Sequence, residues 1–152
     1  MRLLVSTIVG VIMLNSSPTW ASESFKAGFA KTEVTPPAAT PMWGYGARHD
    51  LLSRGTRDPL YAKALVIEVG DQKLALVGLD LGRSPGSPDF DRIVEAVRKK
   101  AGVTQIMMSG SHTHHGPVLE LVDEDGKGKG TFDDAVAYRA ELEQKLIDVI
   151  VK

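Results

Sequence analysis

The stretch from residue 61 to residue 108 constrains the fold more than any other part of this sequence. Two β-rich runs, Tyr61 to Val69 and Lys73 to Leu79, are separated by Gly-Asp-Gln, which predicts a β-hairpin. Apolar residues at helical spacing follow from Phe90 to Val97, and Val103 to Met108 is again an apolar strand pattern. Strand, helix and strand in this order predict a βαβ unit with a parallel pair of strands and a right-handed crossover.

The boundaries of the helix in this unit are also marked in the sequence. Ser87 is expected as the N-cap and Pro88 as the first helical residue, with Asp89 and Asp91 in the first turn. Gly102, which follows three basic residues, is the expected end of the helix.

The remaining segments add one strand, one long loop and one helix. Residues 25–35 alternate imperfectly between apolar and polar, which predicts a strand, and residues 36–60 are a loop rich in Pro, Gly and Arg. A helix is expected from a cap at Thr131 to the last residue, and its apolar final turn, Ile147 to Val151, is expected to pack against a part of the domain outside this sequence. The predicted fold class is α/β, with a mixed sheet built from an N-terminal strand, a β-hairpin and a βαβ unit.

The first 21 residues have the pattern of a secretory signal peptide. Arg2 precedes an apolar run from Leu3 to Leu14, and small and polar residues lead to a cleavage site after Ala21. The apolar run is too short for a membrane span, which needs about 20 residues. We therefore expect a mature domain of residues 22–152 that is secreted or periplasmic and has no stable membrane anchor. A buried N-terminal strand or an anchor are the alternatives.

Composition excludes several classes of function. The chain has no cysteine, which rules out disulfides, thiolate zinc sites and thiol nucleophiles. Its 18 Lys and Arg against 19 Asp and Glu give no electrostatic case for a nucleic-acid partner. A metal ion would have to be held by histidine, carboxylate or tyrosine. There are only four histidines, and three of them, His112, His114 and His115, fall within four positions.

This histidine cluster directly follows the last predicted strand. In an extended segment alternate side chains share a face, so His112 and His114 are predicted to lie together and His115 to point the opposite way. Two neutral imidazoles can both bind one zinc ion, or one can bind the metal while the other contacts a substrate. A polar loop that holds no metal is the alternative.

Asp80 lies at the carboxyl end of the neighbouring strand in the βαβ unit. Ligands of open α/β sheets collect at this end of the strands. Asp80 is therefore predicted to approach the histidines, where it could orient or polarise one of them, and it is a candidate catalytic residue. A strand-end cap is the alternative role.

Five short motifs, taken in order, resemble the N-terminal part of the catalytic domain of the neutral/alkaline (non-lysosomal) ceramidases. The matching segments are GFAKTEVT at 28–35, MWGY at 42–45, AKALVI at 62–67, LDLG at 79–82 and SHTHHGP at 111–117. The resemblance covers residues 25–120. Its specific part is His-Thr-His-x-Gly-Pro after a strand that ends in Asp-Leu-Gly.

The resemblance implies a zinc-dependent hydrolase that cleaves the amide of an N-acyl sphingoid base with a metal-activated water. It implies that His112 is a zinc ligand, that His114 lies beside the metal and assists the substrate or oxyanion, and that the backbone of Gly44 lines the substrate pocket. The family's other zinc ligands are a histidine, a glutamate and a tyrosine from further along the chain, and no histidine follows His115. The sequence is therefore expected to be an incomplete half of a larger catalytic domain, inactive alone and lacking the C-terminal part.

Two departures from the family pattern leave the substrate open. His115 stands where ceramidases have serine, and Val118 stands where they have glycine, so another secreted lipid, amide or ester is a possible substrate. A different histidine-rich metallohydrolase is a second reading, but the His-x-His-x-Asp-His pattern of metallo-β-lactamases fails at Gly116-Pro117. A secreted, non-catalytic binding or structural domain is the third.

Overall fold

The computed structural model of the chain describes residues 24–48, 51–119 and 133–152. The predicted signal peptide at 1–21 and the predicted helix cap at Thr131 lie outside these residues. The elements are, in chain order, β1 (Phe25–Glu33), the 3-10 helix η1 (Gly46–Arg48), β2 (Tyr61–Val69), β3 (Gln72–Leu79), α1 (Asp89–Ala101), β4 (Gln105–Gly110) and α2 (Asp133–Val151).

The four strands form one mixed sheet in the order β1-β2-β3-β4. β1 with β2, and β2 with β3, are antiparallel, whereas β3 and β4 are parallel and are joined through α1. The predicted hairpin, the predicted βαβ unit and the α/β fold class are confirmed. A parallel pair requires a crossover, and the single helix between Leu79 and Gln105 supplies it.

The start of α1 differs from the prediction by one residue. Pro88 is the N-cap and makes no side-chain capping bond, and the helix begins at Asp89. Ser87 precedes the cap, and its hydroxyl donates a hydrogen bond to the side chain of Asp91. At the other end, Gly102 adopts φ of 68° and its N–H donates to the carbonyl of Arg98, as predicted for a glycine that ends a helix.

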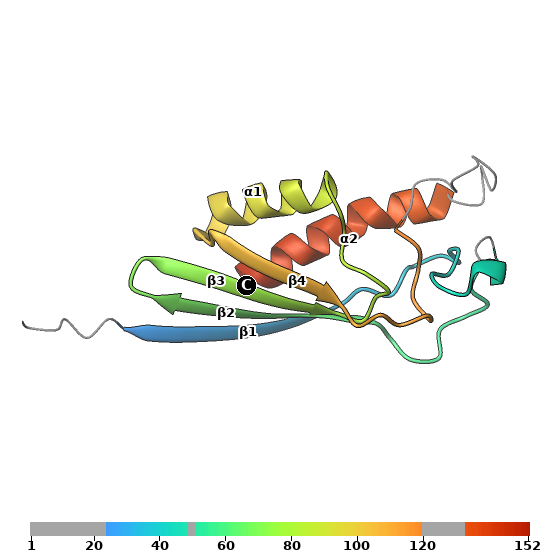
Figure 1. Cartoon of the computed structure of the whole chain (residues 1–152), viewed down its shortest axis with the longest axis horizontal. Helices are drawn as coiled ribbons and strands as arrows, with labels where there is room; N and C mark the ends of the chain where they lie inside the picture. The colour runs from blue at the N-terminus through green and yellow to red at the C-terminus, as the bar shows by residue number, and fades with distance from the viewer. Residues whose placement is uncertain (1–23, 49–50, 120–132) are drawn as a thin grey trace, which may run out of the picture.

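Both helices cover the same face of the sheet, and the core lies between the two layers (Figure 1). Small side chains on β2 and β3, including Ala62 and Ala75, are buried in this core. The expectation that the end of the last helix packs against an absent part of the domain is wrong. In that final turn Ile147 is 5% exposed and Ile150 is 4% exposed, because both pack into the core of this chain.

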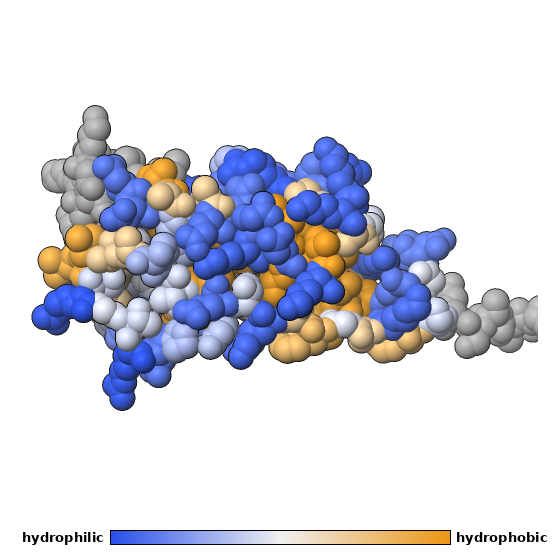
Figure 2. Space-filling model, turned by 180° about the vertical axis from the view of Figure 1, so that it is seen from behind, coloured by the Kyte–Doolittle hydropathy of each residue, from blue (hydrophilic) through white to orange (hydrophobic). Residues whose placement is uncertain are grey.

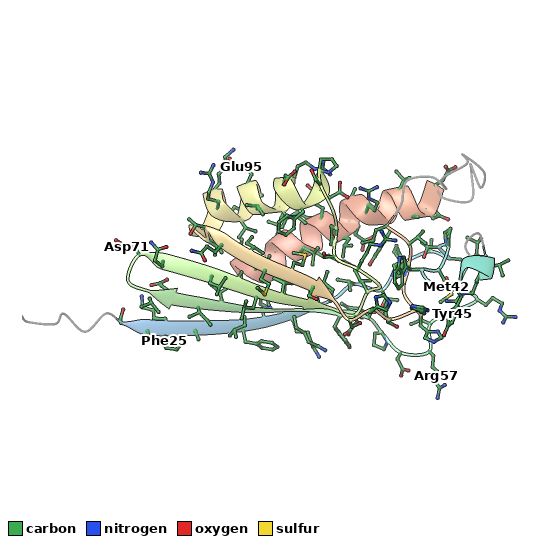
Figure 3. All side chains as sticks on the ribbon, in the orientation of Figure 1. Phe25, Met42, Tyr45, Arg57, Asp71 and Glu95 are labelled. Atoms are coloured by element: carbon green, nitrogen blue, oxygen red, sulfur yellow. The ribbon has the colours of Figure 1, made fainter. Side chains whose placement is uncertain are left out.

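The opposite face of the sheet carries no layer among the described residues. One row of aligned residues crosses this face, namely Phe29, Leu65, Leu76 and Met107. Phe25 shares the face and its side chain points away from the helices (Figure 3). Neither described helix is long and apolar enough to cross a membrane.

Candidate active site

Three segments meet at the end of the sheet where β3 and β4 terminate. The segment after β4 is fixed to β3 because the Ser111 N–H donates to the Leu79 carbonyl at 2.8 Å. The long loop after β1 is fixed to the same segment, since the Trp43 N–H donates to the Gly116 carbonyl at 2.9 Å and Met42 forms a β-bridge with Pro117. Figure 3 shows Met42 and Tyr45 at this end of the molecule. The histidine segment is therefore held from two sides by backbone hydrogen bonds.

The structure brings His112 and His114 together, as the sequence predicts. Their ring centroids lie 5.3 Å apart, with the planes tilted by 50°. The predicted reason is wrong, however, because the segment is not a continuous extended strand. β4 ends at Gly110, and His112 has a left-handed backbone with φ of 62°. This turn, and not strand alternation, sets the direction of the His112 ring.

Two aromatic side chains of the long loop pack against the histidine pair. The Trp43 ring lies 4.8 Å from the ring of His112 and 5.0 Å from that of His114, and Tyr45 lies 4.6 Å from His114, all as centroid distances. All three contacts are close to perpendicular, at 82°. In the sequence Trp43 and Tyr45 belong to the MWGY motif, but nothing local shows that they meet residues about 70 positions away.

Gly44 contacts the His114 ring through its backbone. A Cβ atom on Gly44 would lie 2.5 Å from Cγ of His114, and the φ of Gly44 is 78°. Both the space and the backbone conformation therefore require glycine here. The resemblance implied that Gly44 lines a substrate pocket. In the structure its contact is with the candidate catalytic histidine.

Arg48 is a site residue that the sequence did not reveal. Its guanidinium donates hydrogen bonds to the carbonyl of His114 and, at 3.4 Å, to that of Trp43. Its Nε is buried and has no hydrogen-bond partner among the described residues. Arg48 thus joins the long loop to the histidine segment, and the 66 positions that separate it from His114 leave no local signal.

Asp80 is at the end of β3, as predicted, but its contacts lead to β2. Its carboxylate accepts the Tyr61 N–H at 3.1 Å and lies 3.8 Å from the Lys63 ammonium group. No described contact joins Asp80 to a histidine ring. The geometry is that of a residue that fixes two strand ends.

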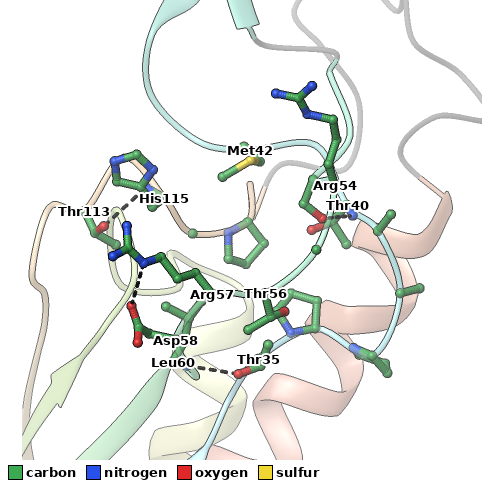
Figure 4. A pocket seen from close by; sticks show the side chains of 18 residues that line it. Thr35, Thr40, Met42, Arg54, Thr56, Arg57, Asp58, Leu60, Thr113 and His115 are labelled. Atoms are coloured by element: carbon green, nitrogen blue, oxygen red, sulfur yellow. Dashed lines mark hydrogen bonds and ion pairs between the residues drawn. The ribbon is translucent and has the colours of Figure 1, made fainter.

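His115 lies apart from the pair and lines a cavity of about 800 Å³ (Figure 4). The cavity is lined by residues 35–40, Met42, residues 53–58, Leu60, Thr113 and residues 115–117. Arg54 and Arg57 also line it, whereas His112, His114 and Gly44 do not. The separation of His115 from the pair agrees with the prediction. The fourth histidine, His49, lies outside the described residues.

The two neighbouring imidazoles fit the donor chemistry of zinc. Two imidazoles bound to one tetrahedral zinc at about 2.1 Å have ring centres about 5 Å apart, and the observed separation is 5.3 Å. Catalytic zinc sites use three protein ligands and a water. Within residues 24–48, 51–119 and 133–152, no group of three histidine or carboxylate side chains converges on one point. The described residues therefore bring two imidazoles together, and a site of three protein ligands would need a further side chain.

Comparison with known proteins identifies the fold. No protein-family model matches the sequence. Among solved structures, the chain is similar to a ceramidase complexed with C2, with a TM-score of 0.60 and 21% identity. It is also similar to the neutral ceramidase from Pseudomonas aeruginosa, with a TM-score of 0.58 and 22% identity. Each similarity covers 85% of this chain but 20% of the solved chain.

These similarities agree with the α/β fold class, built on a mixed sheet, that the sequence predicts. More particularly, the mixed four-stranded sheet with two helices has the fold of part of a neutral ceramidase. The chain spans about a fifth of the length of the solved ceramidases that it matches.

Proposed function

We propose that this chain carries one part of the active site of a secreted, zinc-dependent amide hydrolase of the neutral ceramidase type. The observation that carries the proposal is the His112–His114 pair, 5.3 Å apart at the carboxyl ends of β3 and β4. The similarity of the fold to ceramidases also supports the proposal, because this similarity is an observation separate from the histidine motif. The substrate class is an N-acyl sphingoid base or a related lipid amide.

The residues of this chain have distinct roles in the proposal. His112 would be a zinc ligand, and His114 would lie beside the metal and assist the substrate or oxyanion. When bound, zinc lowers the pKa of a coordinated water to about 7 and polarises the substrate carbonyl. Arg48 holds the backbone of His114, and Gly44 leaves space for its ring. Secretion or periplasmic export is supported by the leader pattern at 1–21.

Zinc binding is the first test. The purified chain is titrated with zinc by calorimetry, alongside His112→Ala, His114→Ala and, as the matched control, His115→Ala. We expect His112→Ala to lose zinc, His114→Ala to keep more of it, and His115→Ala to bind as the unchanged chain does. Equal losses in the first two variants would refute the division of roles. An equal loss in His115→Ala would refute the site itself.

Hydrolysis is the second test. Release of fatty acid from an N-acyl sphingosine is measured for this chain and for the longest product of the gene that encodes it. The described residues supply fewer than the three protein ligands of a catalytic zinc site, so this chain alone is expected to be inactive. The longest product is expected to be active and to lose activity with His112→Ala. Zinc binding without hydrolysis by that product would favour a non-catalytic, metal-binding domain.

A further inference from the structure

Trp43 is a residue whose ring contacts both members of the histidine pair. The three ring centroids form a triangle, with Trp43 at 4.8 Å from His112 and 5.0 Å from His114, and the two histidines 5.3 Å apart. His112 is exposed and has a left-handed backbone, so the main chain around it does not enclose its ring. Trp43 supplies a neighbouring surface against which the His112 ring packs.

Trp43 is itself held by three separate parts of the molecule. Its N–H donates to the Gly116 carbonyl on the histidine segment. Its ring packs against the small cluster of Val118 and Ala135. It also rests on Gly82, where a Cβ atom would lie 2.3 Å from the indole Cδ2. Gly82 comes two residues after Asp80, so the indole joins the end of β3 to the histidine segment.

We propose that Trp43 is a positioning residue, which sets the separation and tilt of the His112 and His114 rings before any metal arrives. Gly82 is the residue that makes room for its indole. The inference rests on the proposed function in one respect, since the pair that Trp43 spaces is the candidate zinc pair. Preorganised ligands bind a metal more tightly, because less freedom is lost when the metal binds.

Zinc affinity in four variants tests the proposal. Trp43→Leu keeps an apolar side chain but removes the ring, and we expect it to weaken zinc binding about 10-fold to 100-fold. Trp43→Phe keeps a smaller ring and should fall between Trp43→Leu and the unchanged chain. Gly82→Ala displaces the indole without altering any histidine contact directly, and should also weaken binding. Gly86→Ala is the matched control, because a Cβ atom there meets nothing within 4 Å.

The positions of the histidine rings provide a readout that general loss of stability would not move. In the metal-free chain, the indole ring current displaces the side-chain proton resonances of His112 and His114. We expect Trp43→Leu to remove this displacement and Gly82→Ala to change it, while Gly86→Ala leaves it intact. Thermal unfolding of every variant is measured alongside. If Trp43→Leu does not fold, Trp43→Phe and Gly82→Ala decide the question.

The outcomes separate this inference from the proposed function. Unchanged zinc affinity and unchanged histidine resonances in Trp43→Leu and Gly82→Ala would overturn the positioning role, while the zinc site stood. A chain that binds no zinc at all would overturn the proposed function. The metal-free resonances would in that case still test whether Trp43 sets the ring geometry.

Discussion

His112 and Tyr45 are the two described non-glycine residues with positive φ, at 62° and 52°. A left-handed conformation costs a residue with a Cβ atom about 1–2 kcal/mol. The side-chain rings of both residues pack directly against the ring of His114. Strain of this kind persists where the surrounding structure fixes the backbone, and it collects at functional sites. At the candidate site, backbone strain at His112 and Tyr45 therefore lowers the stability of the fold, while it sets the positions of their rings.

A pair of substitutions at His112 measures this strain. His112→Gly and His112→Ala both remove the imidazole, but only glycine adopts the left-handed backbone freely. We expect the glycine variant to have the higher free energy of unfolding, by about 1 kcal/mol, in urea denaturation. At His115, whose φ is not positive, the same pair should show no advantage for glycine. A more stable alanine variant at His112 would contradict the argument.

Gly44 offers a test of space as distinct from backbone conformation. Gly44→Ala introduces a Cβ atom 2.5 Å from the His114 ring, at a φ of 78°. Gly55→Ala is the matched control, because its φ is 141° but its Cβ atom meets nothing within 4 Å. Both are expected to lower the free energy of unfolding by about 1 kcal/mol or more. Only Gly44→Ala should shift the His114 ring resonances and weaken zinc binding, and equal effects in both would refute the contact.

The pairing of the two helices depends on Asp89. Its carboxylate accepts hydrogen bonds from Arg92 at 2.6 Å, within α1, and from Nε of Arg139 at 2.8 Å, across to α2. Its side chain is only 11% exposed. Burial alone would raise the pKa of Asp89, but the hydrogen bonds from Arg139 and Arg92 outweigh burial and hold the pKa below its usual value. The charged carboxylate therefore stabilises the contact between α1 and α2.

Asp89→Asn is expected to lower the free energy of unfolding by about 1–3 kcal/mol at neutral pH. Because the pKa is lowered in the folded state, the stabilisation is fully present above the unfolded pKa of about 3.9. It is lost as the pH falls through the lower folded value, so the difference between variant and native chain should narrow below about pH 4. Urea denaturation from pH 3 to pH 7 measures this. Asp91→Asn is the exposed control, and a pH-independent difference for Asp89→Asn would contradict the argument.

At the level of elements, local sequence patterns predicted the secondary structure but missed contacts between residues that are far apart in the sequence. The hairpin and the βαβ unit follow from turns and periodicities within a few residues, and the structure confirms them. The role of Tyr138 could not be predicted. Its buried hydroxyl donates to the Val34 carbonyl at 2.6 Å, 104 positions away, and burial raises its pKa. The contacts of Trp43 and Arg48 with the histidine segment were missed for the same reason, since only the fold brings these positions together.

The whole molecule is a two-layer structure in which one face of the sheet is covered and the other is open. The helical layer is largely hydrophilic outside, and apolar surface is exposed between hydrophilic side chains when the molecule is seen from behind (Figure 2). The candidate site lies at one end of the sheet, where the loops after β1, β3 and β4 meet. Side chains alternate between the two faces of each strand. One set of apolar side chains therefore packs into the core beneath the helices, and a second set lies on the open face of the sheet.

The open face yields a prediction that compares its side chains with those of the covered face. Phe29 is 69% exposed, so Phe29→Thr should change the free energy of unfolding by less than about 0.5 kcal/mol. Val77 is 4% exposed beneath the helices, and Val77→Thr buries a hydroxyl at a cost of more than about 1 kcal/mol. Urea denaturation measures both. Because exposed apolar patches promote association, Phe29→Thr should also reduce light scattering at high protein concentration, while Val77→Thr should not. If Phe29→Thr destabilised the chain as much as Val77→Thr, the face of the sheet that carries Phe29 would have to be covered in the folded protein.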